Sequence, residues 1–384
     1  MRHIAILGST GSIGRQALDV IAANPNRFAV SALAALQKDQ LLETQIEKFH
    51  PDVAVLVDKQ AADRLARRYQ GTTKILAGEE GLLEAATYHK ADTVLTAIVG
   101  FAGLKPTMAA IRAGKTIALA NKETLVSAGE IVTAAAKANH VSILPVDSEH
   151  SAILQCLQGE ENKSIRRLLV TASGGPFRGF TTEQLENVSI EDCLCHPTWT
   201  MGRKITVDSA TLANKGLEVM EAKWLFDIDY DQIEVVVHPQ SMIHSMVEFV
   251  DGAVMAQLGR PDMRVPIQYA LTYPERITAD FPKLDFKTLS ALTFESPDKN
   301  TFPALALAYQ AGRVGGTLPC VFNAANEVAV YAFLQEKIGF SKITAVVKET
   351  MHSHSAMQHP DIEAICTADF WARHKARELV KMMK

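Results

Sequence analysis

The stretch His3-Ile4-Ala5-Ile6-Leu7-Gly8-Ser9-Thr10-Gly11-Ser12-Ile13-Gly14 decides the fold. An apolar run ends at Gly8, three glycines follow with the spacing GxxGxxG, and a helical pattern begins directly afterwards. A buried strand, a tight glycine turn and a helix start, in this order, are typical of a dinucleotide-binding unit. The glycines let the backbone approach a pyrophosphate, and the helix N-terminus offers it N–H groups. The alternative is a glycine-rich turn that binds no ligand.

Strand–helix alternation continues to about residue 147. Apolar runs such as Val53–Val57 and Thr116–Ala120 alternate with amphipathic stretches such as Leu41–Phe49 and Ala61–Tyr69. Apolar strands separated by helices predict a doubly wound parallel sheet. We therefore expect an α/β protein whose residues 1–147 form a Rossmann-like, dinucleotide-binding domain.

The pattern changes after this point. Runs of alternating polarity (Ile233–Val237, Ser245–Val250 and Ala253–Leu258) predict strands of a second, α+β domain over residues 148–282. Residues 283–301 are expected to be a linker, and the helical pattern of residues 302–384 predicts a C-terminal helical domain.

Composition excludes several classes of protein. The chain has 384 residues, a net charge of −4 and 47% hydrophobic residues, which is typical of a globular enzyme and argues against nucleic-acid binding. No run without charged residues approaches the roughly 20 apolar residues of a membrane-spanning helix, and no signal peptide is expected. Five cysteines without a CxxC pair predict neither a disulfide framework nor a cysteine zinc site, so we expect a cytoplasmic protein.

The end of the second strand indicates the cofactor. An NAD site usually carries an acid about 20 residues after the glycine loop, bonded to the ribose. Here the chain reads Leu36-Gln37-Lys38, without an acid at the tip, and Lys38 suits a 2′-phosphate. NADP(H) is therefore favoured over NAD(H), with a solvated helix-start lysine as the alternative.

Carboxylates follow the last strand of the first domain. Asp147 and Glu149 are two residues apart in an expected loop, and Asn214 and Glu218 share a face of an expected helix at positions i and i+4. Crowded carboxylates stay ionised only when a cation joins them, and oxygen ligands favour Mg²⁺ or Mn²⁺. The alternative for Asp147 and Glu149 is capping of an expected helix, Ser151–Leu157.

Other segments offer groups for an anion. The turn Thr171–Phe177 contains small residues that expose N–H groups, and Ser209 with Asn214 and Lys215 adds donors. The segment His196–Arg203 suits a lid that excludes water, although Trp199 could equally pack on the core from a surface loop. His238 and His244 are interpreted as structural. The residues together predict an NADPH-dependent, metal-assisted enzyme for a small phosphorylated carbonyl compound.

The chain resembles the 1-deoxy-D-xylulose 5-phosphate reductoisomerase family. The similar segments occur in the family's order over nearly the whole chain. They are Gly8–Gly14, Ala118–Glu123, Pro145–His150, Ser173–Phe177, His196–Arg203, Val207–Thr211, Asn214–Glu221, His238–His244, Gly259–Arg264 and Asn323–Glu327.

The resemblance implies an activity. The enzyme would rearrange and reduce 1-deoxy-D-xylulose 5-phosphate to 2-C-methyl-D-erythritol 4-phosphate in the non-mevalonate isoprenoid pathway. It would use NADPH and Mg²⁺ or Mn²⁺, with Co²⁺ also admitted, and would form a homodimer through its central domain, which would also carry the catalytic and metal-binding groups. The adenosine 2′-phosphate is the one departure, because the family usually has a glycine and a basic residue where this chain has Leu36-Gln37-Lys38.

The resemblance also implies residue roles. Metal ligation would fall to Asp147, Glu149 and Glu218, and catalysis to Lys122, Glu149 and His196. The cofactor residues would be Thr10, Gly11, Ser12, Ile13, Gln37, Lys38, Asn121, Glu123 and Gly202. The substrate residues would be Lys122, Ser148, Glu149, Ser173, His196, Trp199, Met201, Ser209, Asn214, Lys215 and Glu218.

Two other functions are compatible with a GxxGxxG loop. A semialdehyde dehydrogenase would need a nucleophilic cysteine, and Cys156 lies on an expected apolar helix face, where a buried thiol is inert. A regulator that senses NADPH without chemistry would not need the cluster of acids.

Overall fold

The computed structural model describes residues 1–289 and 291–383. Contacts divide the chain into a first unit (residues 1–124, 132–151 and 262–281) and a second unit (residues 125–131, 152–261 and 282–384). Ser290, inside the expected linker, and Lys384, the last residue of the expected helical domain, lie outside the described residues. The division into three domains with a linker stays a prediction.

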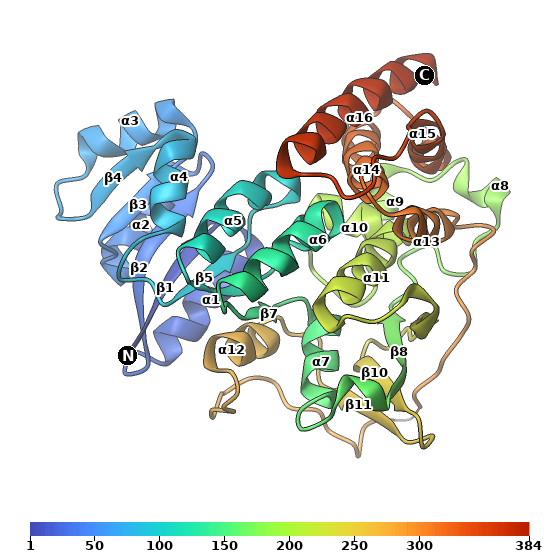
Figure 1. The fold of residues 1–384 in the computed structure, drawn as a ribbon, viewed down its shortest axis with the longest axis horizontal. Coiled ribbons are helices and arrows are strands. Elements are labelled where there is room, and N and C mark those ends of the chain that lie inside the picture. Colours follow the sequence, from blue (N-terminus) through green and yellow to red (C-terminus); the bar gives the residue numbers. More distant parts are fainter. Residues whose placement is uncertain (290, 384) are drawn as a thin grey trace. The chain divides into compact units, whose positions relative to one another are not determined.

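The first unit contains a seven-stranded parallel sheet with the strand order β4-β3-β2-β1-β5-β6-β7 (Figure 1). Its strands are β1 (Arg2–Leu7), β2 (Phe28–Ala35), β3 (Val53–Leu56), β4 (Lys74–Ala77), β5 (Thr93–Thr96), β6 (Thr116–Leu119) and β7 (Ile143–Pro145). The α/β prediction with a doubly wound sheet is confirmed. β4 is an edge strand without a buried residue.

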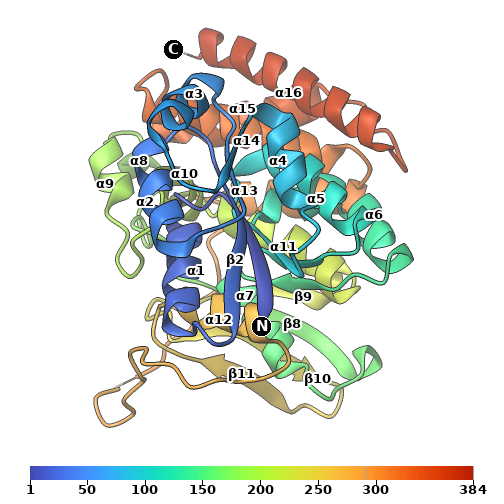
Figure 2. The ribbon, with the colours of Figure 1, turned by 90° about the vertical axis from the view of Figure 1, so that its left-hand side faces the viewer.

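Helices cover both faces of this sheet. Figure 2 shows α1 (Ser12–Ala23) and α2 (Asp39–Phe49) on one face, and α4 (Gly78–Ala86) and α5 (Leu104–Arg112) on the other. Right-handed crossovers produce this arrangement, because the direction of strand addition reverses after β4. The carboxyl ends of β1 and β5 therefore flank the point of reversal, where open α/β sheets bind ligands. The remaining helices of this region are α3 (Lys59–Arg68), η1 (Gly100–Gly103), α6 (Lys122–Ala138), α7 (Ser148–Cys156) and α12 (Arg264–Thr272).

The second unit contains a mixed four-stranded sheet with the order β11-β10-β8-β9. Its strands are β8 (Ile165–Ala172), β9 (Ile233–Val237), β10 (Ile243–Phe249) and β11 (Val254–Leu258). β10 pairs antiparallel with β8 and β11, whereas β8 pairs parallel with β9. The helices are η2 (Asn162–Ser164), α8 (Thr182–Leu185), α9 (Ile190–Leu194), α10 (Arg203–Ala210), α11 (Ala213–Phe226), η3 (Tyr230–Gln232), α13 (Ala304–Val314), α14 (Leu318–Leu334), α15 (Phe340–His352) and α16 (Ile362–Met382).

One hydrophobic core runs through the second unit. It joins residues of β8 and β9 to residues of α11, α13, α14, α15 and α16, the last three of which pack together in Figure 1. Gly216 allows α11 to approach α13 closely, since a Cβ at this position would lie 2.4 Å from Cβ of Ala308. The expected α+β segment and the expected helical segment thus share their core.

The segment before α13 is attached to the four-stranded sheet. Glu295 forms an isolated antiparallel bridge with Val237 at the end of β9. His238 is fully buried, donates from Nδ1 to the carbonyl of Thr293 at 2.9 Å, and accepts at Nε2 from the N–H of Met242 at 3.2 Å. Both ring nitrogens are used within the protein, which supports the structural interpretation of His238.

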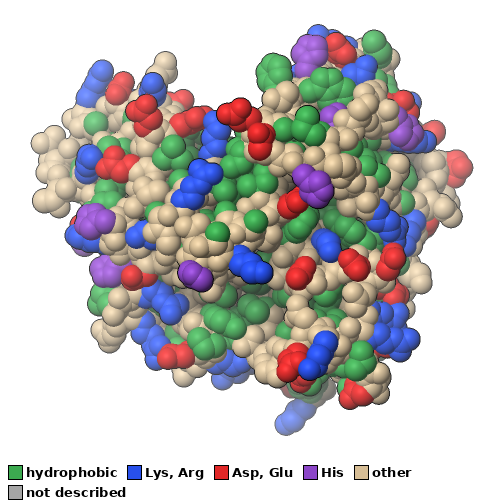
Figure 3. Space-filling model, in the orientation of Figure 1, with side chains coloured by type: hydrophobic (Ala, Val, Ile, Leu, Met, Phe, Trp, Pro, Cys, Tyr) green, Lys and Arg blue, Asp and Glu red, His purple; other side chains and the backbone are tan. Residues whose placement is uncertain are grey.

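The surface is of mixed charge on the face shown in Figure 3, where acidic and basic side chains are interspersed. Among the described helices, none combines the length and the apolar character that crossing a bilayer requires.

Phe177 follows the glycine turn after β8. A substitution at this residue tests whether its ring anchors the turn. Its buried ring packs edge-on against Phe340 of α15, with centroids 5.0 Å apart. We expect Phe177→Ala to lower the free energy of unfolding by about 3–5 kcal/mol, because a buried aromatic ring is replaced by a cavity. Phe180→Ala, at a side chain that is 37% exposed, is the control and should cost about 1 kcal/mol or less in urea titrations. Equal losses of unfolding free energy in the two variants would show that the Phe177 ring does not anchor the turn.

Candidate active site

The glycine loop after β1 is shaped by close backbone contacts. Gly8 has a φ of 99°, and a Cβ there would lie 2.5 Å from the carbonyl oxygen of Ala97, beyond the end of β5. A Cβ on Gly14 would lie 2.3 Å from the carbonyl oxygen of Gly8. α1 begins at Gly11 as its N-cap, and no side chain of the described residues caps it. The first N–H groups of α1, including those of Ser12 and Ile13, are thus available to an anion.

The tip of β2 is open to solvent. Leu36 is 63% exposed, Gln37 and Lys38 are also exposed, and Lys38 is the N-cap residue of α2. A lysine at this place offers its ammonium group to a ligand without a competing acid at the strand tip.

The side chain of Asn121, at the start of α6, forms hydrogen bonds within the protein. Its Nδ2 donates to the carbonyl oxygens of Ile98 (2.6 Å) and Gly100 (2.9 Å), and Oδ1 accepts from Thr124. Its side chain therefore holds the backbone beyond β5. Glu123 is buried and accepts from Asn121 at 3.1 Å.

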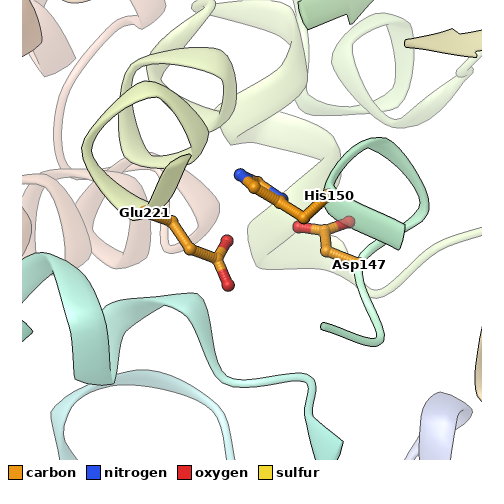
Figure 4. Close-up of side chains that lie close together, drawn as sticks. All are labelled: Asp147, His150 and Glu221. Carbon is orange, nitrogen blue, oxygen red and sulfur yellow. The ribbon is translucent and has the colours of Figure 1, made fainter. Parts of the chain in front are cut away.

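Three predicted residues of the first unit lie at the carboxyl end of β7. Asp147 forms an ion pair with the buried Lys122. The hydroxyl of Ser148 donates to Oε2 of Glu149 at 2.6 Å. Figure 4 shows Asp147 beside His150, and also draws Glu221, a fully buried carboxylate on α11 of the second unit.

The expectation that Glu149 lies in a loop is wrong, because α7 begins at Ser148 and Glu149 stands in its first turn. The capping alternative is partly right. The N–H of Ser148 donates to Oδ1 of Asp147 at 3.0 Å, so this carboxylate stabilises the helix start. The other oxygen, Oδ2, faces Lys122.

The predicted residues of α11 also form a cluster. Asn214 donates from Nδ2 to Oε1 of Glu218 at 2.5 Å, as the spacing i and i+4 predicted. Lys215 pairs with Oε2 of Glu218 at 2.5 Å, and both side chains are at most 5% exposed. Both carboxylate oxygens of the buried Glu218 thus have a donor, one from the Asn214 amide and one from the Lys215 ammonium.

Ser173 and His196 meet in the second unit. The turn after β8 has two residues with positive φ, Gly174 (85°) and Gly175 (70°), and the Ser173 hydroxyl lies 2.9 Å from Nε2 of His196. Nδ1 of His196 accepts the N–H groups of Trp199 (3.0 Å) and Thr198 (3.2 Å). Because Nδ1 is an acceptor, the proton of the neutral ring resides on Nε2, which donates toward Ser173.

Burial lowers the pKa of His196 below 6.5. The ring is therefore neutral at pH 7, with an N–H aimed at the serine. Because the folded-state pKa lies below that of the unfolded chain, this residue contributes stability above about pH 6.5, and the contribution is lost as the pH falls through the folded-state value.

Ser209 lies beside the same turn. A Cβ on Gly175 would come within 2.8 Å of the carbonyl oxygen of Ser209, which is near the end of α10. Asn214 and Lys215 follow in the first turn of α11. The predicted phosphate-binding residues of the second unit thus lie on one turn and two consecutive helices.

The segment between α9 and α10 is irregular, as expected for a lid. Trp199 and Met201 are half-buried, and Gly202 is the exposed N-cap residue of α10. The Trp199 ring lies 6.1 Å from the ring of His244, so this side chain also packs within its own unit.

Sequence reasoning missed a buried network behind Ser209. Asp208 is 1% exposed, pairs with Lys204 at 2.8 Å, and accepts from Nδ2 of Asn326 on α14 at 2.7 Å. The spacing of Lys204 and Asp208 on one helix face was a readable signal, whereas the contact with Asn326 joins residues 118 positions apart.

The tautomer of His196 can be tested directly. We expect nitrogen-resolved histidine NMR spectra to show a neutral ring protonated on Nε2 at pH 6.5, with a pKa below that value. His196→Gln assigns the signal by its disappearance. A ring protonated on Nδ1, or one half-titrated at pH 6.5 or above, would contradict the hydrogen-bond assignment.

Comparison with known proteins covers the whole chain. The family model described as 1-deoxy-D-xylulose 5-phosphate reductoisomerase matches residues 4–129, and the models of two C-terminal domains of that enzyme match residues 143–226 and 258–375. A relative of that name from Heliobacterium modesticaldum is 57% identical over 99% of this chain and 98% of its own. A relative from Bacillus cereus, numbered 1, is 51% identical over 99% of each chain.

Solved structures give the same result. The reductoisomerase from Zymomonas mobilis in complex with NADPH is 43% identical, with a TM-score of 0.93 over 99% of each chain. A DOX-P reductoisomerase in complex with NADPH, fosmidomycin and magnesium is 42% identical, with a TM-score of 0.93 over 100% of this chain and 99% of its own. The chain therefore belongs to the 1-deoxy-D-xylulose 5-phosphate reductoisomerase family.

Proposed function

We propose that this chain is an NADPH- and metal-dependent oxidoreductase that converts 1-deoxy-D-xylulose 5-phosphate to 2-C-methyl-D-erythritol 4-phosphate. The relation that carries the proposal is 57% identity over 99% of the chain to a reductoisomerase. The residues alone predict a coarser activity that agrees with it, an NADPH-dependent, metal-assisted enzyme for a small phosphorylated carbonyl compound. The activity places the enzyme in isoprenoid biosynthesis.

The first unit is proposed to bind NADPH. Thr10, Gly11, Ser12 and Ile13 would meet the pyrophosphate, since the uncapped start of α1 offers N–H groups there. Gln37 and Lys38 would read the adenosine 2′-phosphate from the exposed tip of β2. Asn121 and Glu123 would complete the site, Asn121 through its main chain.

The acids fit a divalent cation. We propose that Asp147, Glu149 and Glu218 would hold one ion, as the family resemblance implies. All three offer oxygen, which suits Mg²⁺, and Mn²⁺ or Co²⁺ by the same chemistry. Two of these carboxylates already have a cationic partner within their own unit. Lys122 pairs with Asp147, and Lys215 pairs with Glu218.

The substrate's phosphate would bind in the second unit. Ser173, Ser209, Asn214 and Lys215 offer hydroxyl, amide and ammonium donors. His196 adds the N–H of Nε2, and a bound phosphate would raise its pKa again. Holding a remote group in this way orients the reacting carbons.

The remaining residues would act around the reacting carbons. When bound, the divalent cation supplies Lewis-acid stabilisation of negative charge on substrate oxygens, and NADPH supplies a hydride. Lys122 and Ser148 would donate to substrate hydroxyls beside Glu149. Trp199 and Met201 would exclude water, and Gly202 leaves room for the nicotinamide, since a Cβ there would meet nothing within 4 Å.

We also propose a homodimer and a cytoplasmic location. β11 is an edge strand whose Val254 and Met255 are 51% and 45% exposed, and a second copy would cover such a surface. Cys193, Cys195 and Cys320 are free thiols, which is typical of a reducing compartment.

The other functions considered lose their support. Cys156 is 7% exposed at the end of α7, which disfavours a nucleophilic role in a dehydrogenase. A regulator without chemistry gives no reason for the paired acids of α7 and α11.

Glu149→Gln and Glu218→Gln test the division of roles. We expect each to weaken Mn²⁺ binding, measured by electron paramagnetic resonance, by about tenfold or more, because a charged ligand is lost. NADPH affinity, measured by fluorescence, should stay within twofold.

Two further variants serve as controls. Glu160→Gln alters an exposed acid and should change neither affinity. Glu221→Gln tests a different set of candidate metal ligands, Asp147, His150 and Glu221. Loss of Mn²⁺ in Glu221→Gln alone would move the ion to that grouping, and equal loss of NADPH affinity in Glu149→Gln would refute the separation of roles.

A further inference from the structure

Gln45 of α2 contacts the backbone of the glycine loop from behind. The residue is 6% exposed, and its Nε2 donates to the carbonyl oxygen of Ser9 at 2.9 Å in a buried hydrogen bond. The N–H of Ser9 donates to the carbonyl oxygen of Ala34 at 2.9 Å. The main chain of Ser9 is thus held on both sides, by β2 and by α2.

This bond determines where the next N–H group points. In a trans peptide the carbonyl oxygen and the following N–H lie on opposite sides of the chain. Because Gln45 holds the carbonyl of Ser9 toward α2, the N–H of Thr10 is turned away from α2. Within the described part of the chain, no acceptor receives this N–H group, so it is available to a ligand.

Packing alone does not explain a glutamine here. Its neighbours Leu42 and Ile46 on the same helix are fully buried apolar residues. The Oε1 atom of Gln45 has no hydrogen-bond partner among the described residues. A buried acceptor without a partner disfavours folding, so an apolar side chain of similar size would satisfy the core better.

We propose that Gln45 is a positioning residue for NADPH: it fixes the Ser9–Thr10 peptide so that the Thr10 N–H faces the pyrophosphate. This inference rests on the proposed function, since the ligand of the loop is the NADPH assigned there. In this proposal Gln45 acts through the Ser9–Thr10 peptide.

Gln45→Met removes the donor and keeps the volume. We expect the Kd for NADPH, measured by fluorescence titration of the full chain, to rise about tenfold, and the Tm to stay equal or increase. Gln40→Met, at an exposed position of the same helix, is the control and should change neither quantity. A Kd within twofold of the unmodified chain, or a Kd rise accompanied by a large fall in Tm, overturns the proposal.

Gln45→Glu gives a second test, which does not require the buried position to accept methionine. A carboxylate cannot donate to Ser9, whereas the protonated acid can. We expect the ratio of the variant's Kd for NADP⁺ to that of the unmodified chain to increase with pH. A ratio independent of pH overturns the proposal. If the unmodified chain binds neither NADPH nor NADP⁺, the proposed function fails, whereas normal binding by both Gln45 variants refutes this inference alone.

Discussion

Ion pairs between carboxylates and buried lysines are the interaction on which the candidate site depends. Asp147 with Lys122, Glu218 with Lys215 and Asp208 with Lys204 each form an ion pair within one unit, and the first two lysines are 8% and 5% exposed. Buried ion pairs add little stability over an apolar core, although removing one partner costs about 3–5 kcal/mol. The pairs at the end of β7 and in α11 are compatible with the proposed function, in which charged groups held out of water would bind a metal and a phosphate.

Local sequence was sufficient for the elements with strong patterns. The strand and glycines of residues 3–14 predicted the nucleotide-binding fold because their backbone demands are specific to few structures. The spacing of Asn214 and Glu218 predicted their contact, since residues four apart share a helix face. The polar stretch from Asp147 to His150 was misjudged as a loop, because a helix start contains the same polar residues as a turn.

Contacts between distant segments could not be predicted. Ser173 meets His196, Asp208 meets Asn326, and Gln45 meets Ser9 across 23, 118 and 36 positions. The same applies to the core that joins β8 and β9 to α13–α16, which depends on the close approach of Gly216 to Ala308. The cation role of Asp147, Glu149 and Glu218 was predicted from residue type and spacing, whereas roles such as those of Lys122 and Ser148 came from the family resemblance, and all of them stay proposals.

Metal-dependent reduction by NADPH can be followed through nicotinamide absorbance. Purified protein would be mixed with 1-deoxy-D-xylulose 5-phosphate and NADPH, with and without Mg²⁺, and with NADH in parallel. We expect the NADPH signal to fall only when Mg²⁺ is present, and the response to NADH to be weak. Oxidation of NADPH that needs no metal, or no oxidation under any condition, would contradict this expectation.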